Sequence, residues 1–285
     1  MSPNTATALG VGAILLWATL ASLTAVKGAV PPFATTAVSL AIGGAIMAAV
    51  ALVRGRPGLL KPTPASLGLG IYGLFVYHAL YFAALSLAPP AEASLITSMW
   101  ALFTVLFSAL LPGHRLRPGH IIGALLGFAA AFVLTHDKLG GTGSDLSDVR
   151  WGYVLAAGCA LVWSSFSVAS RLLAAVPSES LAAPALASAA LAALASLAFE
   201  AWIAPQDWVA WAALAAIGAG PLGIAFLLWD IGMKKGNVPL LGVLSYAALI
   251  ISTALLVILG FAEPAWTLAV ACALMVAAAV VATRP

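Results

Sequence analysis

Short polar, proline and glycine segments divide the chain into ten apolar runs, most of them about twenty residues long. A helix of about twenty residues crosses the roughly 30 Å of hydrocarbon in a bilayer. A membrane barrel would instead show shorter segments of alternating polarity. The runs therefore predict an all-α integral membrane protein with ten transmembrane helices, at residues 5–26, 31–53, 65–87, 90–111, 117–135, 150–173, 179–203, 207–232, 237–260 and 264–282.

Composition excludes a soluble domain, because 63% of the residues are hydrophobic and only 7% are charged, against about 25% charged in soluble proteins. The 12 Lys and Arg residues are scattered and form no basic patch, so we expect no nucleic-acid partner. The N-terminus lacks the basic region of a signal peptide, so we expect the first helix to be retained. Cys159 and Cys272 lie inside apolar runs and are expected to be buried and unpaired.

The basic residues also predict the orientation. With both termini cytoplasmic, only Lys27, Lys138 and Arg150 fall outside. The other nine fall inside: Arg54, Arg56, Lys61, Arg115, Arg117, Arg171, Lys234, Lys235 and Arg284. Cytoplasmic loops carry an excess of Lys and Arg, so nine against three favours ten helices, cytoplasmic termini and insertion in a bacterial-type inner membrane.

An internal repeat is indicated by two similar segments, LLWATLASLT (Leu15–Thr24) and LVWSSFSVAS (Leu161–Ser170). A shift of 147 residues also sets Phe82 on Trp229, Ser98 on Ser245 and Met99 on Tyr246. Because five is odd, a second copy of five helices enters the membrane inverted, as in many secondary transporters. We expect a first repeat at 1–136, an extracytoplasmic connector at 137–149 and an inverted repeat at 150–285.

The chain resembles the drug/metabolite transporter superfamily, specifically its EamA-type exporters, over essentially its whole length. The turn that closes the family's repeat stands here as ILGFAEPAW, with Glu263 before Pro264, whereas the first half carries His114 in that place. No function is therefore carried over to that glutamate. The segments AIGAGPLGIAFLLWDIGMKKG and GLFVYHALYFAAL resemble the amino acid exporters of the family. The resemblance implies export of aromatic and other neutral amino acids, without a cofactor.

Three tryptophans lie too deep in their runs for the interfacial belt, where most membrane-protein tryptophans are found. They are Trp17, Trp100 and Trp163, and they either line a cavity or pack between helices. Belt positions suit the others that we consider: Trp151, Trp202, Trp208, Trp211 and Trp266.

The third run places His78 among Tyr77, Tyr81 and Phe82. A polar side chain within the membrane costs free energy unless it forms a hydrogen bond to protein or to water. His78 contacts substrate, relays protons, or only bonds a neighbouring helix; we favour substrate contact, with Tyr77 and Tyr81 beside it. No carboxylate lies at the middle of a run, which favours uncoupled export or proton transfer through His78 alone. Asp230 and Lys234 are expected to form an ordinary pair across one helical turn.

The remaining candidates follow from the repeat and from helix breakers. Ser98 and the pair Ser245 and Tyr246 are related by the repeat and either bind substrate or join helices. Gly220, Pro221 and Pro184 are candidate hinges, since a missing backbone hydrogen bond permits a kink.

The function that these patterns favour is secondary transport by alternating access, through a central aromatic-lined cavity that binds a small solute, most simply an amino acid. Export of drugs or other metabolites is the alternative, and a channel-like scaffold lacks a visible filter loop. An intramembrane enzyme is not expected, because no HExxH or nucleophile and base pattern is present, and we expect no metal and no catalytic residue. A monomer in membrane lipid is compatible with the sequence.

Overall fold

The computed structural model describes residues 1–88, 90–112, 116–135, 146–261 and 263–283. Within these ranges the chain forms helices and no strands. Seven helices are long and apolar enough to cross a membrane, namely Pro3–Lys27, Pro32–Val53, Pro64–Leu85, Val149–Leu173, Ser178–Phe199, Trp208–Lys235 and Val238–Ile258. Three shorter apolar helices, Ile96–Ser108, Pro118–Val133 and Trp266–Ala282, lie where the remaining runs were predicted.

Most of the long helices are built from shorter pieces. In the first half these are α1 (Pro3–Ala18), α2 (Leu20–Lys27), α3 (Pro32–Val53), η1 (Pro57–Leu60), α4 (Pro64–Ile71), η2 (Tyr72–Val76), α5 (Tyr77–Leu87), α6 (Pro90–Ser98), α7 (Trp100–Ser108) and α8 (Pro118–Thr135). In the second half they are α9 (Leu146–Ala169), η4 (Ser170–Leu173), η5 (Ser178–Leu181), α10 (Ala182–Phe199), α11 (Trp208–Ala219), η6 (Gly220–Ile224), α12 (Ala225–Lys235), α13 (Val238–Leu244), α14 (Tyr246–Ile258) and α15 (Trp266–Thr283). The segments η2 and η6 are π-helical, and both interrupt an otherwise continuous α-helix.

The helices pack in a regular set of pairs. α3 packs along α10, α8 along α15, α1 against α12, and α5 against α9. The α8 and α15 backbones approach closely because glycines face the partner helix: a Cβ on Gly123 would lie 2.9 Å from the carbonyl oxygen of Ala278. This close approach is the use that small residues have in membrane helix pairs.

The α3 and α10 pair is fastened at both ends. The carboxylate of Glu200, just after α10, accepts the backbone N–H groups of Phe33 and Ala34 in the first turn of α3, at 2.7 and 2.9 Å. At the opposite end, Arg54, which follows α3, forms an ion pair with Glu179 of η5. The two helices are therefore antiparallel, with a polar contact at each end of an apolar interface.

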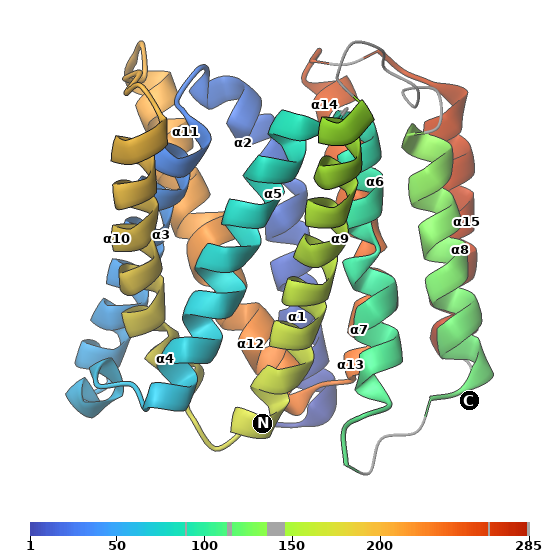
Figure 1. Cartoon of the computed structure of the whole chain (residues 1–285). Helices are drawn as coiled ribbons and strands as arrows, with labels where there is room; N and C mark the ends of the chain where they lie inside the picture. Colours follow the sequence, from blue (N-terminus) through green and yellow to red (C-terminus); the bar gives the residue numbers. More distant parts are fainter. Residues whose placement is uncertain (89, 113–115, 136–145, 262, 284–285) are drawn as a thin grey trace.

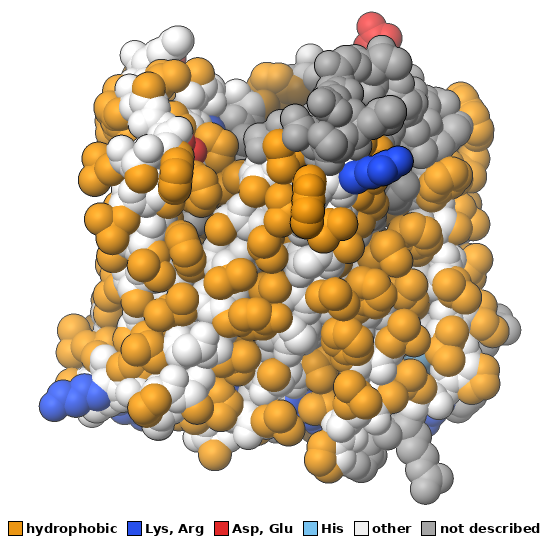
Figure 2. All heavy atoms as spheres, in the orientation of Figure 1, with side chains coloured by type: hydrophobic (Ala, Val, Ile, Leu, Met, Phe, Trp, Pro, Cys, Tyr) orange, Lys and Arg blue, Asp and Glu red, His pale blue; other side chains and the backbone are white. Residues whose placement is uncertain are grey.

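The bundle has two polar ends and an apolar middle. α1 begins and α15 ends at the same end of the bundle, the lower one in Figure 1. Hydrophobic side chains cover the middle of the face in Figure 2, while Lys and Arg side chains lie near its lower and upper edges. The five tryptophans assigned to the belt are all exposed.

Some sequence predictions fall outside the described residues: His114, Arg115, Lys138, Arg284 and all of the 137–149 connector before residue 146. One prediction was half wrong. Cys159 is buried and free, but Cys272 is free and exposed. It lies on α15, and an apolar run in a membrane protein has an outer face that only lipid covers, so hydrophobicity does not imply burial in protein.

Candidate functional site

A cluster of aromatic rings lies where five helices meet. We call Trp17, Trp100, Trp163 and Trp229 the tryptophan cluster; they come from α1, α7, α9 and α12. Tyr77 of α5, Phe166 of α9 and Phe226 of α12 extend it. The sequence-predicted residues Trp17, Trp100, Trp163 and Tyr77 are thus brought together from both halves of the chain.

Trp17 is the centre of the tryptophan cluster. Its ring centroid lies 5.1 Å from that of Trp229, 5.5 Å from that of Trp163 and 6.3 Å from that of Trp100. Trp163 also lies 5.0 Å from Tyr77. The ring planes are tilted or perpendicular, which is the preferred geometry of aromatic pairs. Such rings present faces and edges that suit an aromatic or cationic solute.

The indole N–H of Trp17 is satisfied by an irregular turn of backbone. It donates to the carbonyl oxygen of Pro221, at 2.9 Å. Because η6 is π-helical, the N–H of Ala225 donates to Gly220, five residues earlier, rather than to Pro221. The carbonyl of Pro221 is thereby left for Trp17. The candidate hinge residue Pro221 therefore contacts the candidate binding residue Trp17 directly, and Gly220 precedes it in the same turn.

The α5 face carries His78 in a row of rings. Tyr77 stacks on Tyr81 with centroids 6.2 Å apart, and His78 lies 6.1 Å from Phe82. The Nδ1 atom of His78 is 2.5 Å from the carbonyl oxygen of Leu74 in its own helix, so one ring nitrogen is bonded locally. His78 and Tyr81 are partly exposed rather than fully packed between helices. The row continues from the tryptophan cluster through Tyr77.

The serine and tyrosine candidates related by the repeat lie at helix breaks. Ser98 ends α6, and Ser245 stands between α13 and α14, where its hydroxyl donates to the carbonyl of Leu241 at 2.6 Å. Tyr246 is buried in a second core, between α8, α14 and α15, with its ring against Gly127. Trp100 packs against this same core, so Tyr246 lies in a helix contact that adjoins the tryptophan cluster.

Pro184 lies in the first turn of α10 and not deep in its helix. In a first turn the missing N–H of proline removes no helical hydrogen bond. The ring instead packs against α4, because a Cβ added to Gly70 would collide with it. Pro184 therefore lies at a contact between the two halves.

Trp229 and Phe226 were not predicted as site residues. Trp229 is almost fully buried and donates its N–H to the hydroxyl of Ser167 at 3.0 Å. The shift of 147 residues sets Trp229 on Phe82, and this was the available signal. Among the described residues, no group of three or more His, Cys, Asp and Glu side chains is arranged to hold a metal ion.

Known proteins resemble both halves of this chain. Residues 4–136 and 150–284 each match the EamA-like transporter family. The aromatic amino acid exporter YddG of Ancylobacter novellus is 54% identical over 99% of this chain and 98% of its own length. The uncharacterized inner membrane transporter YhbE of Escherichia coli is 25% identical over 38% of this chain and 33% of its own length.

The fold agrees with these sequence relations. One solved crystal structure aligns with a TM-score of 0.94 and 53% identity, over 99% of this chain and 97% of that one. A match to the family on both halves, together with a close relative along the full length, is decisive: the chain belongs to the EamA-like transporter family.

Proposed function

We propose that this membrane protein exports amino acids, aromatic ones foremost, across the inner membrane. The observation that carries the proposal is the 54% identity, over nearly the whole chain, to an exporter named for aromatic amino acids. The tryptophan cluster supports it, since indole rings bind aromatic side chains by edge and face contacts and attract an ammonium group.

The substrate site lies, in this proposal, between the tryptophan cluster and the α5 row. Trp17, Trp100, Trp163 and Tyr77 form one wall. His78 and Tyr81 form its continuation, and His78 contacts substrate with the ring nitrogen that Leu74 does not occupy. Ser98 and Ser245 stand at helix breaks related by the repeat. Tyr246 is included in the proposed site, and its ring lies against Gly127.

Two inverted repeats of five helices, at 1–136 and 150–285, account for the packing. A twofold relation between the repeats makes α1 equivalent to α9 and α12 equivalent to α5. The contact of α1 with α12 then predicts a contact of α9 with α5, and both contacts occur. The pairs α3 with α10 and α8 with α15 map onto themselves, and both occur as well. The π-helical turns support the same relation, since η2 shifted by 147 residues falls one residue from η6.

We further propose that transport occurs by alternating access. We propose that the halves change their packing around the tryptophan cluster, with the π-turn at Gly220 and Pro221 and the contact at Pro184 as hinges. Ten transmembrane helices and cytoplasmic termini complete the proposal. They are supported by the excess of basic residues at the end where α1 begins.

The proposal is tested with purified full-length protein in liposomes. Saturable uptake of labelled phenylalanine, with competition from unlabelled tryptophan, is the expected result. Trp163→Ala should lower this uptake by about ten-fold or more, because it removes a ring that contacts five others. Trp208→Ala, whose ring is 79% exposed, is the matched control and should transport normally. Uptake that stays linear with concentration, or competition only by unrelated metabolites, would contradict the proposal.

A further inference from the structure

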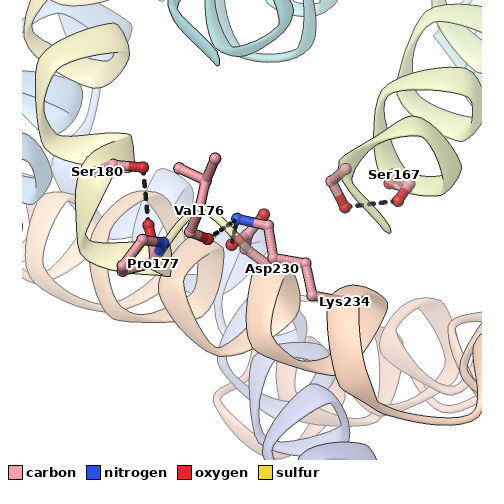
Figure 3. A network of polar contacts seen from close by, with 7 residues as sticks. Ser167, Val176, Pro177, Ser180, Asp230 and Lys234 are labelled. Carbon is pink, nitrogen blue, oxygen red and sulfur yellow. Dashed lines mark hydrogen bonds and ion pairs between the residues drawn. The ribbon is translucent and has the colours of Figure 1, made fainter. Parts of the chain in front are cut away.

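Asp230 and Lys234 form an ion pair that is buried inside the protein. Their side chains are 3% and 5% exposed, and the Nζ of Lys234 lies 2.7 Å from Oδ2 of Asp230. Lys234 also donates to the carbonyl of Val176, at 2.9 Å. Figure 3 shows the lysine between these two oxygens. The sequence predicted an ordinary pair across one helical turn; the pair does form, and the connection between η4 and η5 covers it.

Burial makes this pair costly, because two charges lose their water and regain only part of that free energy from each other. The pair is not the sole attachment of this end of α12. Arg171 already holds the end of α12, since its guanidinium donates to the carbonyls of Met233 and Gly236 at 3.0 and 2.8 Å. Charged residues inside transmembrane segments commonly serve substrate or ion pathways.

A small cavity of about 20 Å³ adjoins the pair. Its polar lining consists of Asp230, Lys234 and the hydroxyls of Ser66, Ser170 and Ser180. A volume of this size holds about one water molecule in the conformation of the structure. Arg54 and Glu179, the other ion pair at this end, do not line it.

The cavity is connected to the tryptophan cluster by one shared ring. Phe166 lines the cavity, and its ring centroid lies 5.4 Å from that of Trp163. Lys234, which also lines the cavity, lies at the end of α12, and this end adjoins the beginning of α1, because the backbone N–H of Asn237 donates to the hydroxyl of Thr7 at 2.9 Å. The cavity therefore lies toward the end of the bundle that carries the termini. Its lining comes from α4 of one half and from α9, η4, η5, α10 and α12 of the other.

We propose that Asp230 and Lys234 are a loading site for the zwitterionic head group of the exported amino acid. This inference rests on the proposed function and on its cytoplasmic termini. The ammonium of the cargo binds Asp230 and its carboxylate binds Lys234 as α4 separates from Pro184 and the cavity widens. Each internal charge exchanges one partner for another, so neither is left unpaired in a buried place. The side chain of the cargo then faces Phe166 and the tryptophan cluster.

Analogues that lack one charge test this assignment. Inside-out membrane vesicles expose the cytoplasmic face, and competition against labelled phenylalanine is measured with 3-phenylpropionate, which lacks the ammonium, and with 2-phenylethylamine, which lacks the carboxylate. In the wild type each analogue should compete about ten-fold less well than phenylalanine, because one buried charge contact is missing. In Asp230→Asn, 3-phenylpropionate should compete as well as phenylalanine, because the partner of the ammonium is gone. In Lys234→Met, 2-phenylethylamine should compete as well as phenylalanine, because the partner of the carboxylate is gone.

The double variant Asp230→Asn with Lys234→Met guards against misfolding, because it leaves no unpaired buried charge. Both disadvantages should vanish in it. The control variant Arg54→Gln with Glu179→Gln removes the ion pair outside the cavity and should keep both. A pair that only latches the bundle would change the maximal rate and preserve the preference for phenylalanine over both analogues, and that result overturns the loading site. Wild-type vesicles without phenylalanine flux overturn the proposed export itself.

Discussion

At the scale of single residues, the site depends on polar atoms that find partners far away in the chain. Trp17 reaches the carbonyl of Pro221, and Trp229 reaches the hydroxyl of Ser167. Inside the bundle, an N–H donor without an acceptor is destabilising, because no water is present to accept its hydrogen bond. These hydrogen bonds therefore fix the orientation of the two indole rings, whereas burial of apolar surface alone does not select one orientation.

Replacing Trp17 by Phe tests that contact. The variant keeps a ring but leaves the carbonyl of Pro221 without its donor, so we expect a loss of about 1–3 kcal/mol in stability. The midpoint of thermal unfolding in detergent measures the loss. Trp208→Phe removes an exposed indole and should leave the midpoint unchanged. Equal midpoints in the two variants would show that the Trp17 contact is not stabilising.

Glu200 offers a second residue-scale test. Its two oxygens accept two N–H groups at the positive end of α3, and Glu200→Gln removes the charge and one acceptor. We expect a loss of about 0.5–2 kcal/mol. Glu263→Gln, at an exposed position, is the control for a surface carboxylate. The same thermal assay decides, and a Glu200 variant as stable as its control would refute the capping role.

At the scale of elements, the π-helical turns explain what periodicity could not. Depth along an apolar run was enough to pick out Trp17, Trp100 and Trp163, because a count of residues measures distance along a helix. A π-turn adds a residue and rotates everything after it. The partners Pro221 and Phe226, on either side of the end of η6, therefore could not be placed against Trp17 from an ideal helical wheel.

The contact of α4 with α10 gives the element-scale prediction. A methyl group on Gly70 would collide with the ring of Pro184, whereas one on Gly68 meets open space. Gly70→Ala should cost about 1–3 kcal/mol through overpacking and hold the two elements apart. Gly68→Ala should be neutral or slightly stabilising. The midpoint of thermal unfolding and the rate of phenylalanine uptake are compared between the two variants. Equal values would show that the contact between α4 and α10 accommodates a methyl group without cost.

At the scale of the whole molecule, the all-helical class and the places of the apolar helices could be predicted because hydropathy and punctuation are local properties. Pairing of helices is not local. Glu200 and Glu179 join α3 to α10, and their partners Phe33, Ala34 and Arg54 lie more than a hundred residues away in the sequence. Burial of Asp230 likewise depends on a connection that covers it, which no pattern within α12 reveals.

Orientation is testable in whole cells. In a Cys272→Ser background, Arg56→Cys marks the end of the bundle that holds the termini, and Gln206→Cys marks the other; both positions are exposed. A membrane-impermeant maleimide should label Gln206→Cys in intact cells, and Arg56→Cys only after the membrane is opened, because basic loops stay cytoplasmic. The reverse pattern would invert the proposed topology.

The spacing of the tryptophan cluster has an optical consequence. Indoles with centroids 5.1 to 6.3 Å apart are close enough to share and quench each other's excitation. Phenylalanine bound at the proposed site between Trp17 and Trp163 would separate two of these emitters, and phenylalanine itself adds almost no light in that range. Under the proposed function, the change in tryptophan emission would then report occupancy without any attached dye.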